Sequence, residues 1–419
     1  MLDINLIRAD PERVKKGIMT KNADPKLVDE FLWFDGKWRA LMQEVENLRA
    51  RQKKAGEERN IKEAKQLKEE IHAKEGALRE VENTRDTVLR KLPNLPLPSV
   101  PVGASDKENM VLREVGEKPK FDFAPRDYLA LAEALDLVDM ERAAKVSGSR
   151  FAYLKNEAVL LEFAIARLVF DTLGKEGFVP LVPPVIVNEE MMRGMGYVDR
   201  GEDLDETYYL EKDKQYLVGT AEQSVGPMHA GEIFSEQELP KRYVAFSTSF
   251  RREAGSYGKD TKGILRVHQF DKLEMFSFTQ PEDSHAEHEF LLAMEEKLMQ
   301  ALSIPYRVLG ICTADLGVPA AAKYDIEAWL PGQNGGKGEY RETHSTSNTT
   351  DFQARRLNIR CRADEQAKPE FVHTLNGTAC AIGRILIALM ENYQQKDGSI
   401  KVPDALVPSM DGMREIRRQ

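Results

Sequence analysis

The chain has few cysteines and no long apolar run, and both absences limit what the protein is. Its three cysteines, Cys312, Cys361 and Cys380, are widely spaced and odd in number. Such a set is typical of reduced thiols and argues against a disulfide framework or a structural zinc site built from cysteines. The longest apolar stretches, such as 385–390, are far shorter than the ~20 residues of a membrane-spanning helix. Because no secretory signal is recognisable either, we expect a cytoplasmic protein that makes no membrane contact.

The N-terminal quarter has apolar residues at heptad spacing, which predicts two helices packed as an antiparallel pair over about 27–92. The first series comprises Leu27, Phe31, Phe34, Trp38, Leu41, Val45 and Leu48. After a turn expected near 55–56, the second comprises Ala64, Leu67, Ile71, Leu78, Val81, Val88 and Leu92, interrupted by Lys74 and Arg85. The proline-rich segment 93–101 predicts a stiff linker. We therefore expect an N-terminal domain over 1–103 and a second domain over 104–419.

The tip of this helical pair is basic, although the whole chain has a net charge of -9. Segment 49–68 holds eight Lys and Arg residues, which include Arg49, Arg51, Lys53, Lys54 and Arg59, against three Glu residues. A local basic cluster on an acidic protein favours contact with a polyanion. By itself, however, the pattern is more typical of a solvated coiled-coil face with mixed charge.

The segments 250–255 (FRREAG) and 266–274 (RVHQFDKLE) predict a β-hairpin with a charged face. Because alternate side chains of a strand share a face, Arg251 and Glu253 should point together, as should Phe270, Lys272 and Glu274. The residues expected to point into the core are Val244, Phe246 and Phe250. An aromatic ring, a guanidinium and carboxylates over one patch suit a nucleotide with its phosphates. A solvated face with ion pairs is the alternative that this segment alone leaves open.

The segment 378–393 (TACAIGRILIALMENY) is apolar around nearly its whole circumference and predicts a buried helix. Arg384 is its only charge before Glu391. A buried guanidinium needs an anionic partner, because an unpaired one is destabilising by several kcal/mol. Either an internal carboxylate or a ligand phosphate would provide it.

Together these segments resemble the class II aminoacyl-tRNA synthetases, with motif one at about 177–187, in which Pro184 matches the obligatory proline, motif two at about 243–276 and motif three at about 376–393. The subtype resembled is seryl-tRNA synthetase of the ordinary bacterial type, over essentially the full chain. The segments that carry this resemblance are 251–256 (RREAGS), 266–270 (RVHQF), 324–331 (YDIEAWLP), 347–356 (SNTTDFQARR) and 373–378 (HTLNGT).

The resemblance implies an α+β fold: an antiparallel two-helix coiled-coil arm, followed by a catalytic domain with an antiparallel β-sheet flanked by helices. It also implies a homodimer with a C2 interface at motif one. The implied reaction activates L-serine with ATP and Mg²⁺ to seryl-adenylate and then charges the 3′ end of tRNA(Ser). The tip residues Arg49, Arg51, Lys53, Lys54 and Arg59 would contact that tRNA. Whether selenocysteine tRNA is also a substrate stays open.

Site residues follow from the motifs residue by residue, as the resemblance implies. The catalytic residues are Arg251 and Arg384, which neutralise phosphate charge. The serine-binding residues are Thr220, Ala221, Glu222, Glu274, Asn376 and Thr378. The ATP-binding residues are Arg251, Arg252, Glu253, Val267, Phe270, Glu342, Thr343, His344, Ser345 and Arg384, of which Glu342 and Ser345 are the Mg²⁺ ligands. For His268 we favour a structural role over general-base catalysis.

Two alternatives lie outside this reading. A non-catalytic RNA-binding descendant of a synthetase would keep the arm but has no reason to retain the five residues Arg251, Glu253, Phe270, Glu342 and Arg384 together. A class II paralogue that loads an amino acid on a carrier protein would lack the heptads of 27–92. The sequence therefore favours the complete enzyme over both.

Overall fold

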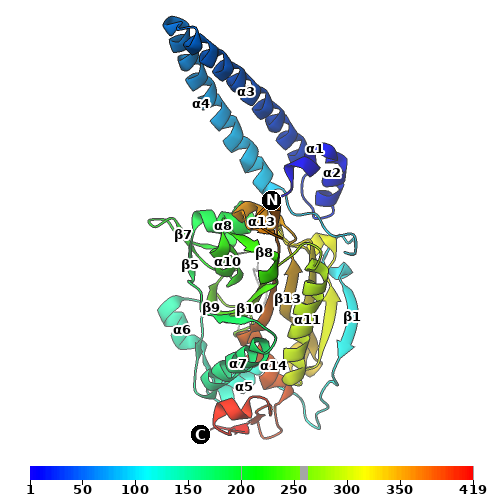
Figure 1. The fold of residues 1–419 in the computed structure, drawn as a ribbon. Helices are drawn as coiled ribbons and strands as arrows, with labels where there is room; N and C mark the ends of the chain where they lie inside the picture. Colours follow the sequence, from blue (N-terminus) through cyan, green and yellow to red (C-terminus); the bar gives the residue numbers. More distant parts are fainter. Residues whose placement is uncertain (200, 255–262, 419) are drawn as a thin grey trace. The chain divides into compact units, whose positions relative to one another are not determined.

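The computed structural model describes residues 1–199, 201–254 and 263–418, without the side chains of 201–203 (Figure 1). Gly255 and Ser256 of the expected motif two lie outside the described residues, as does the rest of the loop up to 262. The chain divides into two compact units, Met1–Leu95 and Pro96–Gln419.

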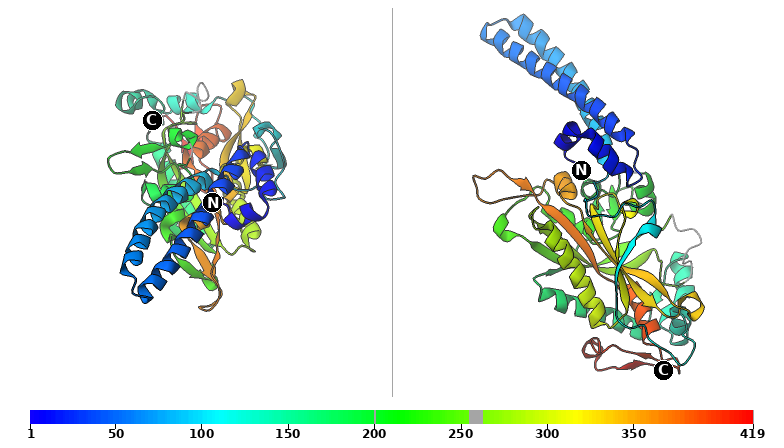
Figure 2. Two further views of the ribbon diagram at one scale, coloured as in Figure 1. Left: turned by 90° about the horizontal axis from the view of Figure 1, so that it is seen from above. Right: turned by 90° about the vertical axis from the view of Figure 1, so that its right-hand side faces the viewer.

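The first unit consists of helices α1 (Ile4–Ala9), α2 (Pro11–Met19), α3 (Lys26–Glu57) and α4 (Ile61–Lys91). Helices α3 and α4 run antiparallel and side by side in all three views of this unit (Figures 1 and 2), so the predicted coiled-coil arm is confirmed. At 32 residues, α3 is about 48 Å long. The turn comes slightly later than expected, because α3 continues through Glu57 and the side chain of Asn60 begins α4 by accepting from the Glu63 N–H.

The two charged interruptions of the second heptad series have local partners in the arm. The ammonium of Lys74 lies 2.6 Å from a Glu44 carboxylate oxygen on the facing helix. The guanidinium of Arg85 lies 4.4 Å from the centre of the Trp38 ring and pairs with Asp86. A charge within the seam is therefore compensated by a partner across it or beside it.

The second unit is built on an eight-stranded sheet with the order β1-β11-β12-β13-β16-β10-β9-β4. All neighbouring strands are antiparallel except β4 and β9, which are parallel. The strands are β1 (Met110–Val115), β4 (Val179–Leu181), β9 (Lys241–Phe250), β10 (Gln269–Thr279), β11 (Tyr306–Gly310), β12 (Ala322–Leu330), β13 (Glu339–Asn348) and β16 (His373–Ala381). The predicted α+β class with a mainly antiparallel sheet is confirmed, and Figure 1 shows β1 at the right-hand edge of the sheet.

Three helices, α7 (Glu157–Gly174), α11 (Ser284–Ala301) and α14 (Ile382–Asn392), pack in one hydrophobic core against one face of this sheet. Strand alternation on β10 explains the division of the faces. Leu273 and Met275 belong to this core, whereas Lys272 and Glu274 point to the opposite face. That opposite face is the one available for a ligand.

The remaining elements are shorter and lie around the sheet. The helices are α5 (Tyr128–Ala134), α6 (Met140–Ser147), α8 (Glu189–Met195), α9 (Gly201–Glu206), α10 (Glu222–Val225), α12 (Gln333–Gly336) and α13 (Phe352–Leu357). The strands are β2 (Val138–Asp139), β3 (Tyr153–Leu154), β5 (Ile186–Asn188), β6 (Tyr208–Leu210), β7 (Gln215–Leu217), β8 (Ile233–Ser235), β14 (Arg360–Arg362), β15 (Glu370–Phe371), β17 (Ile400–Lys401) and β18 (Glu415–Ile416). Single helical turns occur at Asp106–Glu108, Gly226–His229, Glu236–Glu238, Thr313–Asp315 and Val407–Met410.

Three local expectations need correction. The helix expected over 378–393 begins only at Ile382, because residues 378–381 pair with β10 as the end of β16. Phe250 was expected in the core but lines a cavity, because β9 ends at this residue. The stiff linker expected over 93–101 does not extend over the whole segment, since the backbone N–H of Leu97 donates to the Ala321 carbonyl within the second unit.

Every helix in the described residues is too short or too polar to cross a membrane.

Candidate active site

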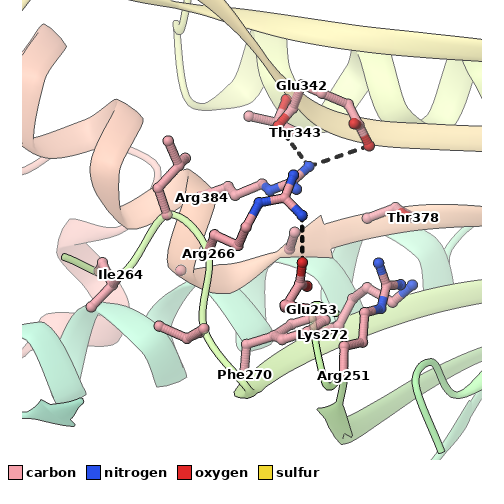
Figure 3. Close-up of a pocket in the computed structure, with 14 residues that line it drawn as sticks. Arg251, Glu253, Ile264, Arg266, Phe270, Lys272, Glu342, Thr343, Thr378 and Arg384 are labelled. Atoms are coloured by element: carbon pink, nitrogen blue, oxygen red, sulfur yellow. Dashed lines mark hydrogen bonds and ion pairs between the residues drawn. The ribbon is translucent and has the colours of Figure 1, made fainter. Parts of the chain in front are cut away.

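A cavity of about 750 Å³ opens over the sheet face that carries Lys272 and Glu274, and a recess of about 70 Å³ adjoins it (Figure 3). Together they bring the following predicted site residues to one place: Thr220, Glu222, Arg251, Glu253, Val267, Phe270, Glu274, Glu342, Thr343, Ser345, Asn376, Thr378 and Arg384. These residues come from elements as far apart as α10, β10, β13, β16 and α14 and from the segments that join them.

Arg251 follows the last residue of β9 and lies in the wall shared by cavity and recess. Its Nε donates to the Gly219 carbonyl at 3.1 Å, and its guanidinium lies 5.4 Å from the centre of the Phe270 ring. A fixed guanidinium beside an aromatic plate is suited to a phosphate that is joined to a base.

Glu253 adopts a left-handed backbone with φ of 53°, which is unusual for a residue other than glycine. Its carboxylate forms an ion pair with Arg266 (Figure 3), and the Arg150 Nη1 donates to its carbonyl at 3.4 Å. Contacts from Arg266 within the hairpin and from Arg150 outside it therefore hold this strained residue in place.

Arg384 projects from α14 towards Glu342 on β13 (Figure 3). Its Nη1 lies 3.2 Å from a Glu342 carboxylate oxygen and donates to the Glu342 carbonyl at 2.9 Å. With 28% of its side chain exposed, Arg384 is only half-buried, because it stands at the cavity wall. Desolvation acts to raise the pKa of Glu342, but the charges of Arg384, Lys323 and Arg251 outweigh it and lower that pKa. Glu342 is thus an internal carboxylate partner of the kind expected for Arg384, and the Arg384 guanidinium still faces the cavity.

Glu222 begins α10 and is almost completely buried at the other end of the cavity. Its carboxylate accepts hydrogen bonds from the Tyr197 hydroxyl at 2.8 Å, the Gln353 amide at 2.8 Å and the Asn376 amide at 2.5 Å. Burial, together with the charge of Glu274, raises the pKa of Glu222 to about 7 even though these donors favour the charged form. A cationic ligand at this end would favour ionisation of Glu222.

Glu274 lies beside Glu222 and forms an ion pair with Lys272 two residues away on β10. Burial lowers the pKa of Lys272, although the charge of Glu274 acts in the opposite direction. The cavity thus has a carboxylate-rich end at Glu222 and Glu274 and a guanidinium-rich end at Arg251 and Arg384.

Three predicted residues are not brought into the cavity. Ala221 is buried in an apolar cluster beneath it, and the guanidinium of Arg252 lies 5.5 Å from the Tyr208 ring instead. The side chain of His344 points to the opposite face of β13, where it lines a small hollow with Leu298 and Cys380. Strand alternation explains the orientation of His344, because adjacent side chains of a strand point to opposite faces and the next residue, Ser345, faces the cavity.

His268 has a structural contact in place of a catalytic one. Its Nδ1 lies 3.0 Å from the Arg251 carbonyl, and its ring packs on Phe151. The structural role expected for His268 agrees with these contacts.

Several lining residues were not predicted as site residues: Tyr197, Gly219, Arg266, Lys272, Lys323 and Ser347. Alternation along β10 pointed to Lys272, and Arg266 stands within motif two. For Tyr197 and Lys323 no local signal existed, since the fold brings them to the cavity from other segments.

The cavity has hard oxygen donors that suit Mg²⁺, because the Glu342 carboxylate and the Ser345 hydroxyl both line it from β13. Within the described residues, no group of three or more His, Cys, Asp and Glu side chains is arranged to hold a metal ion. Any bound metal would therefore take further ligands from a substrate or water.

Comparison with known proteins connects both units to one family. Residues 1–96 match the seryl-tRNA synthetase N-terminal domain, and residues 208–393 match the class II tRNA synthetase core domain (G, H, P, S and T). The chain is 48% identical to serine–tRNA ligase of Dictyoglomus turgidum, over 100% of this chain and 99% of that protein. It is 46% identical to the Thermobifida fusca enzyme, with 97% of each chain covered.

Solved structures show the same similarity over the whole length. Seryl-tRNA synthetase from Pyrococcus horikoshii complexed with ATP has a TM-score of 0.93 at 40% identity and covers 100% of both chains. Cytoplasmic serine–tRNA ligase from Naegleria fowleri in complex with AMP has a TM-score of 0.89 at 34% identity and covers 100% of this chain and 99% of that one.

Proposed function

Because the chain belongs to the seryl-tRNA synthetase family of class II aminoacyl-tRNA synthetases, we propose that its cavity activates L-serine with ATP and transfers the seryl group to tRNA(Ser). The observation that carries this proposal is the convergence of two subsites in one cavity. A guanidinium-rich end at Arg251 and Arg384 adjoins a carboxylate-rich end at Glu222 and Glu274.

ATP binds at the guanidinium-rich end. Phe270 offers a face for the adenine ring, and Glu253 and Val267 border the same recess. Arg251 holds the α-phosphate, and Arg384 neutralises the terminal phosphates. Glu342 and Ser345 would hold Mg²⁺, which would supply further neutralisation of phosphate charge.

Serine binds at the carboxylate-rich end. Its ammonium group needs an anion, which Glu222 supplies, and its hydroxyl needs a hydrogen-bonding partner, which Glu274 and Thr378 supply. Asn376 orients Glu222 through the hydrogen bond between their side chains. A site that pairs a hydroxyl rejects an analogue without it by roughly 10⁴- to 10⁵-fold.

The chemistry needs no side-chain nucleophile. A serine carboxylate oxygen attacks the α-phosphorus of ATP, the bond to the bridging oxygen breaks, and pyrophosphate leaves with the electron pair. The terminal ribose hydroxyl of the tRNA then attacks the seryl carbonyl, the bond from the carbonyl carbon to the phosphate oxygen breaks, and AMP leaves with the electron pair while the hydroxyl proton passes to the leaving phosphate or to water. The chain contributes position and charge neutralisation, since Arg251 and Arg384 flank the place where negative charge develops.

The arm of the first unit binds tRNA(Ser). The tip side chains Arg51, Lys53 and Arg59 are exposed, and among the described residues none has a carboxylate within ion-pair distance. Arg49 pairs with Glu75 at 2.7 Å, and Lys54 lies 3.9 Å from Glu58. Unpaired cations on a rigid helical pair suit the backbone of an RNA helix, which proteins recognise mainly by shape and phosphate contacts. Charging assays with selenocysteine tRNA decide whether the enzyme also uses that tRNA.

The enzyme acts as a homodimer in the cytoplasm. The expected motif-one segment and the helix before it expose large apolar side chains, namely Leu160, Phe163, Val179, Val182 and Ile186. A patch of this kind on α7, β4 and β5 is suited to a C2 interface. The tRNA-binding part extends over 1–103 and the catalytic part over 104–419, whereas the compact units divide between Leu95 and Pro96.

Amino-acid-dependent ATP/pyrophosphate exchange tests this function. We expect strong exchange with serine and less than about one hundredth of that rate with alanine, which lacks the hydroxyl. Threonine tests whether the pocket has room for one more methyl group. Comparable exchange with alanine, threonine or proline would overturn the substrate assignment, and absence of any exchange would favour a non-catalytic RNA-binding protein. A carrier-protein ligase would show exchange but would not charge tRNA.

A further inference from the structure

The wall of the cavity formed by β12 and β13 carries a cation that the proposed reaction does not yet use. Lys323 lies on β12 and lines the cavity, with about 20% of its side chain exposed. Its ammonium is 3.1 Å from an Asp325 carboxylate oxygen two residues along the strand. Strand alternation places both side chains on the cavity face.

The register of the two strands fixes where this ammonium stands relative to the proposed Mg²⁺ ligands. Lys323 is opposite Ser347, and Asp325 is opposite Ser345, one pleat further along β13. Two residues of a strand span about 7 Å, which is within the reach of a lysine side chain plus one phosphate group. A phosphate that approaches Ser345 and Glu342 therefore comes close to Lys323.

The ammonium has capacity for another ligand. A lysine carries three N–H donors, and the carboxylate of Asp325 lies close enough to engage one of them. Burial acts to lower the pKa of Lys323, but the negative charges of Asp325, Glu342 and Asp315 outweigh it and raise that pKa, so the ammonium stays protonated. A compact cation with free donors in a cavity wall is suited to a phosphate oxyanion.

We propose that Lys323 is a further substrate-binding residue, whose ammonium holds a phosphate oxyanion at the β12–β13 wall of the cavity. This inference rests on the proposed function, because it assumes that phosphates enter this cavity. The oxyanion has two sources in the reaction: the terminal phosphates of ATP, released as pyrophosphate, and the backbone phosphates near the 3′ end of the tRNA. A competing explanation is that Lys323 only neutralises Asp325, whose carboxylate is almost completely buried.

The test begins with Lys323→Met in ATP/pyrophosphate exchange at fixed free Mg²⁺. If the terminal phosphates are the source, the KM for pyrophosphate rises about tenfold or more, as expected for the loss of a hydrogen bond to a charged group, and the KM for serine stays within about twofold. If the tRNA is the source, exchange is unchanged and the variant binds intact tRNA(Ser) more weakly. In that case the variant and the wild type bind with equal affinity to a tRNA without its 3′-terminal nucleotides.

The double variant K323M/D325N separates ligand binding from neutralisation of Asp325. If Lys323 only compensates that carboxylate, removal of both charges restores the affinity that Lys323→Met reduced. If Lys323 binds phosphate, the double variant stays as weak as the single one. Lys241→Met is the matched control, because Lys241 also pairs with a carboxylate at 3.1 Å and is 25% exposed, but it does not line the cavity.

Restoration in the double variant, or wild-type affinity for both pyrophosphate and intact tRNA in Lys323→Met, would overturn the inference while leaving the proposed function intact. Failure of the wild-type protein to catalyse serine-dependent exchange would instead overturn the proposed function.

Discussion

At the residue scale, two guanidiniums lie at one end of the cavity and two buried carboxylates, those of Glu222 and Glu274, at the other. Arg251 and Arg384 stand at one end, each held by a backbone carbonyl, of Gly219 and of Glu342 respectively. Because these carbonyls and the Glu342 carboxylate orient the guanidiniums before a substrate binds, the electrostatic field for phosphates is already in place.

We predict that Arg251→Ala and Arg384→Ala each lower kcat/KM for serine activation by about a hundredfold, or ~3 kcal/mol, the typical loss for one charge-stabilising donor. Arg384→Ala also leaves Glu342 without its closest cation. Exchange kinetics measure the effect, and thermal melting checks the fold. Arg414→Ala is the control, since Arg414 pairs with Asp404 at the same 3.2 Å but far outside the cavity lining. Wild-type rates in a folded Arg251→Ala protein would contradict the assignment.

Glu222 makes serine binding depend on pH. Its pKa of about 7 means that the free carboxyl is largely protonated below neutrality, whereas the serine ammonium requires the carboxylate. We therefore predict that the KM for serine rises as pH falls from 8 to 6, approaching tenfold per pH unit below about 7. In Glu222→Gln the KM is high and nearly flat over this range. A flat wild-type profile would show that Glu222 does not bind the ammonium.

The raised pKa of Glu222 also makes the free energy of unfolding depend on pH. Because its pKa is raised on folding, the folded state holds more protons than the unfolded state between pH 4.5 and about 7. The contribution of Glu222 to the free energy of unfolding therefore falls as pH rises through this window and is constant above it. We expect Glu222→Gln to lose less stability than the wild type between pH 5 and 7.5, measured by denaturant unfolding.

At the element scale, α3 and α4 form a unit whose base and tip have different roles. The base packs Phe31, Val88 and Leu89 against α1 and α2, whereas the tip has its own small cluster of Leu48, Ala55, Leu67 and Ile71. Replacement of 49–70 by a short Gly/Ser connector therefore keeps the base cluster intact. We predict near wild-type serine-dependent exchange but a strong loss of tRNA affinity. Unchanged charging of tRNA(Ser) would show that the arm is a spacer.

A milder change tests the charges of the tip alone. We predict that the replacement of Arg51, Lys53 and Arg59 together by Gln weakens tRNA binding. The magnitude of the slope of log K against log salt should fall by roughly 0.7 to 0.9 for each phosphate that the tip no longer neutralises. Binding is measured between about 50 and 200 mM salt. The control is a variant in which three exposed cations of the catalytic unit are replaced by Gln: Lys145, Lys396 and Arg414. An equal slope in both variants would contradict the proposed role of the tip.

At the scale of the whole molecule, the apolar patch on α7 and β4 predicts the assembly. Phe163 is 63% exposed, and its replacement by Glu places a charge within the proposed interface. We expect Phe163→Glu to be monomeric by sedimentation and to lose serine activation. The control is Ile61→Glu on the arm, which should stay dimeric; Ile61 is 81% exposed in the wild type. A dimeric, active Phe163→Glu protein would place the interface elsewhere.

The sequence by itself determined the features that depend on local periodicity. Heptad spacing predicted α3 and α4, and period two placed Phe270, Lys272 and Glu274 on one face, because both patterns are properties of a single segment. The motifs also pointed to most of the cavity lining. Where β16 ends and α14 begins was beyond local pattern, since an apolar run suits a buried strand and a buried helix equally.

Only the tertiary structure decided which distant residues meet. The hydrogen bond between Asn376 and Glu222 joins residues 154 positions apart, and Tyr197 and Gln353 complete the same cluster. The exclusion of His344 and the inclusion of Lys323 follow from the faces of β13 and β12, and the half-exposure of Arg384 from its place at a cavity wall. Sheet register and packing set these relations, and no single segment of the sequence contains them.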